Sequence, residues 1–171
     1  MNGLIGKFIQ QKQLIKDLSA KNLAETYLKK AKTNIITMEL LSKATKFRDV
    51  LALPSDYGTD EWIVVTAYYA MYLAALSLLA KLGFRSKTHT ATAVALEEFF
   101  VKKKLLDKIH LENFERIKMK KEEVEALREA RDRREIAQYS VTKKTTKELA
   151  DKTKDDAHEF VNRTEEILEL L

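Results

Sequence analysis

The amino-acid sequence predicts an all-α fold, an up-and-down bundle of four to five main helices plus a short connector helix. The 171 residues include only four glycines and one proline, too few turn-forming residues for a many-stranded sheet. Ala, Leu, Lys and Glu are frequent throughout, and apolar residues recur at spacings of three and four. With 45% hydrophobic residues, the chain is expected to be a single domain over residues 1–171 with a substantial buried core.

The first half of the chain predicts two helices followed by a loop. Residues 1–18 mix charged and apolar residues at helical spacing and lack the apolar run of a signal peptide, so we expect an extra N-terminal helix. Ser19 is expected to cap the second helix. Residues 53–60 hold the single proline and predict a loop. The apolar face of the second helix comprises Leu23, Tyr27, Ala31, Ile35, Met38 and Leu41.

A third helix is expected over residues 60–82, with Gly83 ending it and Ser86 or Thr88 capping a fourth. Residues 62–80 contain no charged residue and are long enough to cross a bilayer. Tyrosine, threonine, serine and alanine make this run less apolar than a typical membrane span. The composition therefore favours a central helix of a bundle over a membrane helix, and we expect no membrane association.

The second half of the chain predicts three more helical pieces. A short amphipathic connector helix is expected around residues 105–117, and another helix carries Val124 and breaks near Ser140. Thr145 and Glu148 have the spacing of a capping box, which predicts the start of the last helix. The apolar face of that helix comprises Leu149, Ala157, Phe160, Thr164, Ile167 and Leu171.

Residues 131–139 are the strongest candidate site, because three arginines and a tyrosine lie at the end of a predicted helix. Helical spacing places Arg133 on a stripe with alanines, where a phosphate can approach the backbone closely. The pattern alone favours a simpler interpretation, in which these arginines pair with Glu129, Asp132 and Glu135 on a solvated face. The candidate phosphate- or nucleotide-binding residues are Arg131, Arg133, Arg134 and Tyr139.

Positive charge is concentrated between residues 101 and 121, although the whole chain has a formal net charge of only +5. Such a segment attracts polyanions such as RNA, with strong salt dependence. A solvated lysine-rich face, common in thermophilic proteins rich in Lys and Glu, explains the pattern equally well. The candidate RNA patch comprises Lys102, Lys103, Lys104, Lys118, Lys120 and Lys121.

Other chemistry is poorly represented in the sequence. The absence of cysteine excludes disulfides and thiol nucleophiles and suits a cytoplasmic protein. There is no phosphate loop, no dinucleotide-binding motif and no pair of histidines at metal-ligand spacing, so neither a metal nor a cofactor is expected. His89 is expected to make a local hydrogen bond, and His110 and His158 are expected to be exposed.

Three stretches resemble the HEPN family, small all-α proteins of archaea and bacteria that are often encoded beside minimal nucleotidyltransferases. Residues 68–71 read Tyr-Tyr-Ala-Met, and residues 87–89 read Lys-Thr-His, as in the family. Residues 134–139 read Arg-Glu-Ile-Ala-Gln-Tyr, similar to the Arg-x-x-Ala-Asp-Tyr pattern of one HEPN branch. The resemblance extends from about residue 20 to the end of the chain.

The resemblance implies a bundle that dimerises through its arginine-bearing helices, with a cleft at the dimer seam. Catalytic HEPN proteins are metal-independent ribonucleases, many of them toxins, that carry Arg, four to six residues, then His. Other members bind nucleotides or RNA, or act with nucleotidyltransferases. Here the residue five places after Arg134 is Tyr139. An ordinary tyrosine, with a pKa near 10, is a poor general base at pH 7, but it can donate a hydrogen bond to a phosphate that Arg134 clamps.

The sequence therefore predicts a homodimeric HEPN-like module that binds nucleotide or RNA phosphate, in a toxin–antitoxin system or beside a nucleotidyltransferase partner. The first alternative is a metal-independent endoribonuclease toxin with Arg134 and Tyr139 as an atypical catalytic pair. The second alternative is a purely structural dimer or protein-interaction module, whose arginines make ion pairs only.

Overall fold

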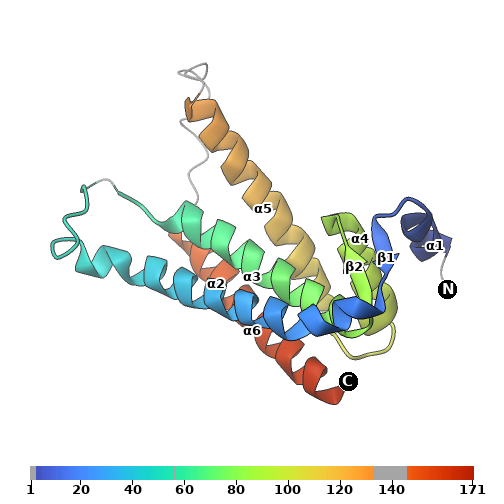
Figure 1. The fold of residues 1–171 in the computed structure, drawn as a ribbon. Helices are drawn as coiled ribbons and strands as arrows, with labels where there is room; N and C mark the ends of the chain where they lie inside the picture. Colours follow the sequence, from blue (N-terminus) through green and yellow to red (C-terminus); the bar gives the residue numbers. More distant parts are fainter. Residues whose placement is uncertain (1–2, 56, 133–145) are drawn as a thin grey trace.

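The computed structural model describes residues 3–55, 57–132 and 146–171, and within them the chain is an all-α bundle, as predicted (Figure 1). The four long helices are α2 (Ala24–Ala44), α3 (Asp60–Lys81), α5 (Lys108–Asp132) and α6 (Lys147–Leu170). Two shorter helices, α1 (Gly3–Gln10) and α4 (His89–Leu96), lie together at one end of the bundle.

Helix α3 is the central element, packed against α2, α5 and α6. It is apolar on nearly all sides, which suits a helix surrounded by amphipathic partners. Its length and hydropathy would permit a membrane span, but 72% of its most apolar 18-residue window is buried by the rest of the protein. No membrane insertion is indicated, and the prediction of a buried bundle helix is confirmed.

The apolar faces predicted for α2 and α6 point into the core. Ala31 and Met38 of α2 are fully buried, as are Phe160 and Ile167 of α6. Leu171, which the spacing also placed on the α6 face, lies beyond the end of the helix and is 48% exposed.

The N-terminal segment differs from the prediction of one helix over residues 1–18. The helix ends at Gln10, and the strand β1 (Leu14–Lys16) pairs antiparallel with β2 (Phe84–Ser86). Lys12 has a φ of 55° in the turn between α1 and β1, a left-handed conformation that interrupts the helix. This small sheet joins the N-terminal segment to the turn after α3.

The segment before α2 also begins differently from the prediction. A 3₁₀ helix (Leu18–Leu23) precedes α2, and the carboxylate of Asp17 accepts a hydrogen bond from the backbone N–H of Ser19. Ser19 is therefore not the cap of α2. Asp17 instead caps the 3₁₀ helix, because its side chain satisfies a backbone donor that has no partner within that helix.

The turn between α3 and α4 follows the sequence prediction more closely. Gly83 adopts a φ of 79°, a left-handed conformation that glycine tolerates without steric cost, and it ends α3. The Thr88 side chain accepts a hydrogen bond from the backbone N–H of Ala91 at 3.2 Å, which confirms Thr88 as the cap of α4. One π-helical turn (Glu97–Val101) extends α4 towards the loop that leads to α5.

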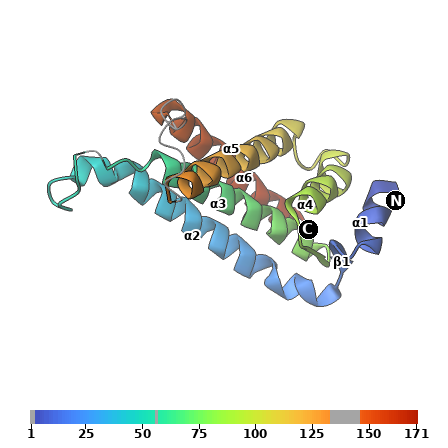
Figure 2. The ribbon, with the colours of Figure 1, turned by 90° about the horizontal axis from the view of Figure 1, so that it is seen from above.

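Helix α5 is continuous, so the separate connector helix predicted around residues 105–117 is wrong. Leu111, Phe114, Ile117 and Val124 are buried along a single helix. The lysines between the apolar clusters obscured this continuity in the sequence, although straight-chain residues are good helix formers. Towards its C-terminal end, α5 projects away from the other helices (Figure 1), and seen from above it lies over α3 (Figure 2).

The cap of α6 lies one residue later than the predicted capping box. Thr146 accepts a hydrogen bond from the backbone N–H of Leu149 at 3.2 Å. Thr145 and the break predicted near Ser140 lie outside the described residues.

Candidate functional site

Residues 131–139, which we call the arginine segment, begin in the last turn of α5. Arg131 belongs to the last turn of that helix, whereas Arg133, Arg134 and Tyr139 lie outside the residues that the structure describes. The segment joins α5 to α6. Its role in binding phosphate stays a prediction from the sequence.

The six lysines of the predicted RNA patch fall into two groups on different elements. Lys102, Lys103 and Lys104 are exposed in and beside the turn after the π-helical segment. Lys118, Lys120 and Lys121 lie on α5, and Lys118 is about 15 Å along the helix axis from the first residue of α5.

Four of these lysines are paired with glutamates one helical turn away. Such exposed pairs add little stability, but each places a negative charge beside the lysine and weakens the positive potential of the face. The pairs are Lys102 with Glu98 at 2.7 Å, Lys118 with Glu122 at 3.4 Å, Lys120 with Glu123 at 3.1 Å and Lys121 with Glu125 at 2.5 Å.

A stack of aromatic rings fills the space between α3, α4 and α5. The ring of His89 stacks on Phe114 with 4.2 Å between centroids, and it lies 5.9 Å from Tyr68 and 6.1 Å from Tyr72. Phe114 also stacks on Phe160 of α6 at 5.7 Å. The elements that supply the other rings are distant from Phe114 along the chain, so the sequence alone does not reveal this stack.

His89 is buried as a neutral ring. Neither of its ring nitrogens has a hydrogen-bond partner among the described residues, so the predicted local hydrogen bond is absent there. Burial is the main cause that lowers the pKa of His89 to about 4, and the nearby charge of Lys118 adds to the shift. At neutral pH this histidine carries no charge and cannot serve as a phosphate-binding cation.

Tyrosines of α3 meet a lysine of α5 at the edge of the stack. The Lys121 ammonium lies 5.3 Å from the ring centroid of Tyr68 and 5.7 Å from that of Tyr69. Burial raises the pKa of Tyr68 to about 12, so its phenol stays protonated at neutral pH. Tyr69 is 42% exposed, and Trp62, two turns earlier on α3, is 40% exposed.

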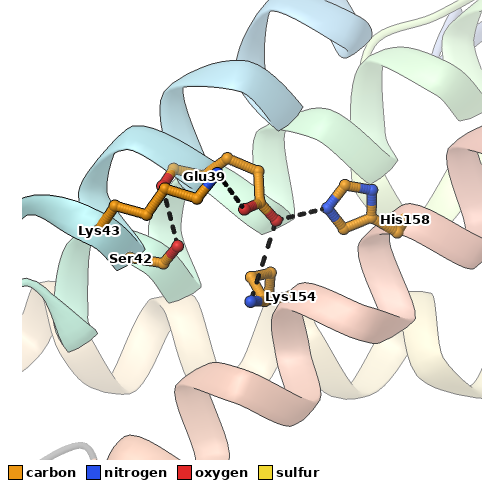
Figure 3. Close-up of polar contacts among 5 residues, drawn as sticks. All are labelled: Glu39, Ser42, Lys43, Lys154 and His158. Carbon is orange, nitrogen blue, oxygen red and sulfur yellow. Dashed lines mark hydrogen bonds and ion pairs between the residues drawn. The ribbon is translucent and has the colours of Figure 1, made fainter.

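The first of two polar clusters joins α2 to α6 (Figure 3). The Glu39 carboxylate contacts His158 Nε2 at 2.8 Å and lies 3.7 Å from Lys43 and 3.9 Å from Lys154. Hydrogen bonding to His158 and the nearby positive charges hold the pKa of Glu39 below its usual value. His158 was predicted to be an exposed helix residue, but the structure gives it this specific partner on another helix.

The other polar cluster links α5 to α6. Arg116 donates to Asp156 at 2.6 Å and to the Asn113 side-chain oxygen at 2.9 Å, and Asn113 donates to Asp156 at 2.9 Å. Because the Asp156 carboxylate accepts from both Arg116 and Asn113, this network fixes α5 against α6.

An apolar cavity of about 520 Å³ lies at the C-terminal end of α2. It offers almost no polar group with which to orient a ligand, unlike typical small-molecule sites. Its lining comprises Thr37, Leu40, Leu41, Lys43, Ala44, Phe47, Val50 and Leu51.

Across the described part of the chain, no group of three or more His, Asp or Glu side chains has an arrangement that could hold a metal ion. The structure thus brings together an aromatic stack and two polar clusters that the sequence analysis did not identify. The signals existed in Tyr68, Tyr72, His89 and Phe114, but only the packing of α3 against α4 and α5 joins them.

Comparison with known protein families gives a match over most of the chain. The HEPN domain family profile matches residues 20–171, from the 3₁₀ helix before α2 to the end of the chain. No curated protein matches the sequence significantly.

Proposed function

The chain belongs to the HEPN family, and from this we propose that it is a nucleotide- or RNA-phosphate-binding module. The observation that carries the proposal is the match over nearly the whole chain, because the family is generally associated with nucleotides and RNA. The ion-paired lysines of α5 add little support, since glutamates neutralise much of their charge.

We assign phosphate recognition to the arginine segment. A guanidinium offers a planar fork of donors that matches two phosphate oxygens, and a protonated tyrosine can donate a third hydrogen bond. Arg134 is the principal residue in this assignment, with Arg131, Arg133 and Tyr139 as supporting groups. Tyr139 stands where catalytic HEPN proteins carry histidine, so binding without cleavage is the better-supported activity.

The biological setting that we propose is a cytoplasmic homodimer in a toxin–antitoxin system or beside a minimal nucleotidyltransferase. Two features are compatible with a dimer. Helix α5 extends beyond the bundle at its C-terminal end (Figure 1), and α2 exposes large apolar side chains such as Leu40, which is 66% exposed.

The test is to incubate the protein with labelled single-stranded RNA in EDTA, following retardation and cleavage together across a salt series. We expect salt-sensitive retardation of intact RNA. Arg134→Ala should weaken binding, because one phosphate contact is lost. The slope of the logarithm of the binding constant against the logarithm of the salt concentration should then become shallower by about one. Lys29→Ala removes one exposed charge from α2 and serves as the matched control.

Other outcomes would replace this function. RNA cleavage that survives EDTA and disappears in Arg134→Ala would identify a metal-independent ribonuclease despite Tyr139. If RNA and nucleotides do not bind at all, and Arg134→Ala instead dissociates or destabilises a dimer, the arginines have a structural role.

A further inference from the structure

The positive charge of the chain is concentrated at one end of the molecule. This end comprises residues 1–18, with α1 and β1, and residues 81–108, from the end of α3 to the start of α5 (Figure 1). These two segments contain ten basic and four acidic residues, whereas the rest of the chain contains 21 basic and 22 acidic residues. The rest of the chain is therefore close to neutral, and a polyanion that approaches the protein is attracted mainly towards this end.

The acidic C-terminal end of α6 lies close to these segments but is partly compensated. The Arg163 guanidinium donates to the carbonyl of Leu105 at 2.8 Å, which places this part of α6 against the loop before α5. Two of the three glutamates in the last two turns of α6 are paired. Glu166 forms an ion pair with Arg163 at 2.6 Å, and Glu165 forms one with a lysine of α2. The end of α6 therefore cancels only part of the positive charge.

Six lysines at this end of the molecule are exposed and form no ion pair with any residue that the structure describes. An unpaired ammonium keeps its full charge for a ligand. The lysines of α5 differ in this respect, because each of them has a glutamate beside it. We refer to the six lysines as the basic end. They are Lys7, Lys12, Lys16, Lys87, Lys103 and Lys104.

The fold holds the N-terminal lysines beside Lys87. Ile5 of α1 is fully buried in the core, and β1 pairs antiparallel with β2. The backbone N–H of Lys87 donates to the carbonyl of Gln13 at 2.9 Å, so Lys87 lies opposite the residue that follows Lys12. The small sheet thus sets the positions of these lysines.

The basic end differs from the RNA patch that the sequence predicted. It keeps Lys103 and Lys104 of that patch, but it replaces the paired lysines of α5 with Lys87 and the three lysines of the N-terminal segment. The family profile begins at residue 20, so these three lysines lie outside the matched domain. Only the pairing of β1 with β2 brings them to the domain.

We propose that the basic end binds the phosphate backbone of RNA. This inference rests on the proposed function and adds a second contact surface to it, separate from the arginine segment. Lysine is a compact point charge that attracts phosphate without reading the base. Several unpaired lysines complement a polymer with one negative charge per nucleotide, and binding releases the counterions that this polymer holds.

Helix α5 sets the distance between the two contact surfaces. It starts at Lys108, four residues after Lys104, and its last turn carries Arg131 of the arginine segment. Its 25 residues span about 37 Å. A stacked strand with a phosphate every ~3.4 Å needs about eleven nucleotides to cover this distance. A long RNA can therefore contact both surfaces, whereas a very short one contacts a single surface at a time.

The first measurement is the dependence of affinity on RNA length. We would titrate the protein with labelled oligouridylates of four and twenty nucleotides across a salt series. The wild type should bind the 20-mer roughly tenfold or more tightly than the tetramer at low salt, because two linked contacts raise the effective concentration of each other. The salt dependence should also be steeper for the 20-mer.

The second measurement uses the triple variant Lys12→Gln/Lys16→Gln/Lys87→Gln, which removes three charges around the small sheet. Each lost contact to single-stranded RNA should make the salt slope shallower by about 0.7, hence by about two in total. The variant should also lose most of the preference for the 20-mer. The three side chains are exposed, so the fold should persist, and circular dichroism and thermal unfolding check this.

The matched control is Lys29→Gln/Lys30→Gln/Lys46→Gln. These lysines are also exposed and form no ion pair with a described residue, but they lie on α2 and the 3₁₀ helix after it. The control changes the net charge by the same amount. It should bind the 20-mer almost as the wild type does, because salt screens charges that do not touch the RNA.

The outcomes separate this inference from the proposed function. If the triple variant and its control bind the 20-mer equally, while Arg134→Ala loses binding, the basic end is wrong and phosphate binding by the arginine segment stands. If the triple variant loses binding and Arg134→Ala does not, the basic end stands and the arginine assignment fails. If the wild type binds neither RNA nor nucleotide, both fail. If the triple variant keeps RNA but loses binding of polyglutamate, the basic end recognises an acidic protein, which also overturns this inference.

Discussion

At the residue scale, His89 shows how packing decides the chemistry of a titratable group. Its position beside Thr88 at a helix start suggested a local hydrogen bond, but its ring is stacked on Phe114 and its nitrogens have no partner among the described residues. Protonation would place a charge inside an apolar stack, which is why burial lowers the pKa of His89.

This shift predicts a pH dependence of stability. The pKa of His89 is about 4 in the folded protein, against the ordinary value of 6.5, so the unfolded chain binds more protons between these pH values. The free energy of unfolding should therefore fall as the pH is lowered from about 7 towards 4. His89→Phe keeps a flat ring and removes the titrating group, so it should flatten this dependence. Urea denaturation at pH 7 and pH 5 measures the difference.

His110→Phe provides the comparison for this prediction, because it replaces a histidine that lies edge-on to Phe160 and leaves His89 in place. Since His89 is retained, the fall in the free energy of unfolding between pH 7 and pH 5 should persist in this variant. Parallel curves for the wild type and His89→Phe would show that protonation of His89 does not oppose folding.

At the element scale, the sequence predicted the long helices better than their connections. The structure confirms the helices that apolar spacing predicted for α2, α3 and α6, because each of them buries one face or most of its surface in the core. The strands β1 and β2 have three residues each and lie almost seventy positions apart, so their pairing leaves no local periodicity. The continuity of α5 was missed because lysines separate its apolar residues.

The candidate sites were predicted less well than the helices. A cluster such as Glu39 with His158 and Lys154 depends on the register of α2 against α6, which the periodicity of either helix alone does not specify. The aromatic stack likewise draws its rings from several helices. The arginine segment, by contrast, is contiguous in sequence and could be identified without any knowledge of packing.

The cluster between α2 and α6 predicts a modest effect on the association of these helices. Glu39→Gln removes the charge that faces Lys43, Lys154 and His158. Because these groups are partly exposed, the loss should be on the order of 1 kcal/mol or less at pH 7. Folding lowers the pKa of Glu39 below its ordinary value of 4.5. Its contribution to the free energy of unfolding is therefore fully present above pH 4.5 and is lost as the pH falls through the folded pKa.

Thermal unfolding at pH 7 and pH 3 would check this contribution. Glu159→Gln, which removes an exposed charge from α6 beside His158, is the control and should leave the melting temperature unchanged. Equal melting temperatures of Glu39→Gln and the wild type at pH 7 would show that the cluster adds no net stability.

At the scale of the whole molecule, the fold depends on one apolar helix whose length and hydropathy would also permit a membrane span. The size of its buried side chains distinguishes a helix packed in a protein core from a helix that spans a bilayer. Helix α3 carries alanines at buried positions such as Ala67, Ala70 and Ala74, all with no exposed surface. Small side chains let α2 and α6 approach closely, whereas a lipid environment would accept larger apolar residues at the same positions.

Ala74→Leu tests this distinction directly. In a bilayer the change would make α3 a better span, since leucine partitions favourably into lipid. In the bundle it forces three additional carbons into a fully packed core and should lower the free energy of unfolding by about 1–3 kcal/mol. The same change at Ala44, which lines the cavity of about 520 Å³ at the end of α2, has room for the larger side chain and should cost little. Urea denaturation of both variants without detergent measures the contrast, and a stabilising effect of Ala74→Leu would contradict the packing of α3 as the centre of the bundle.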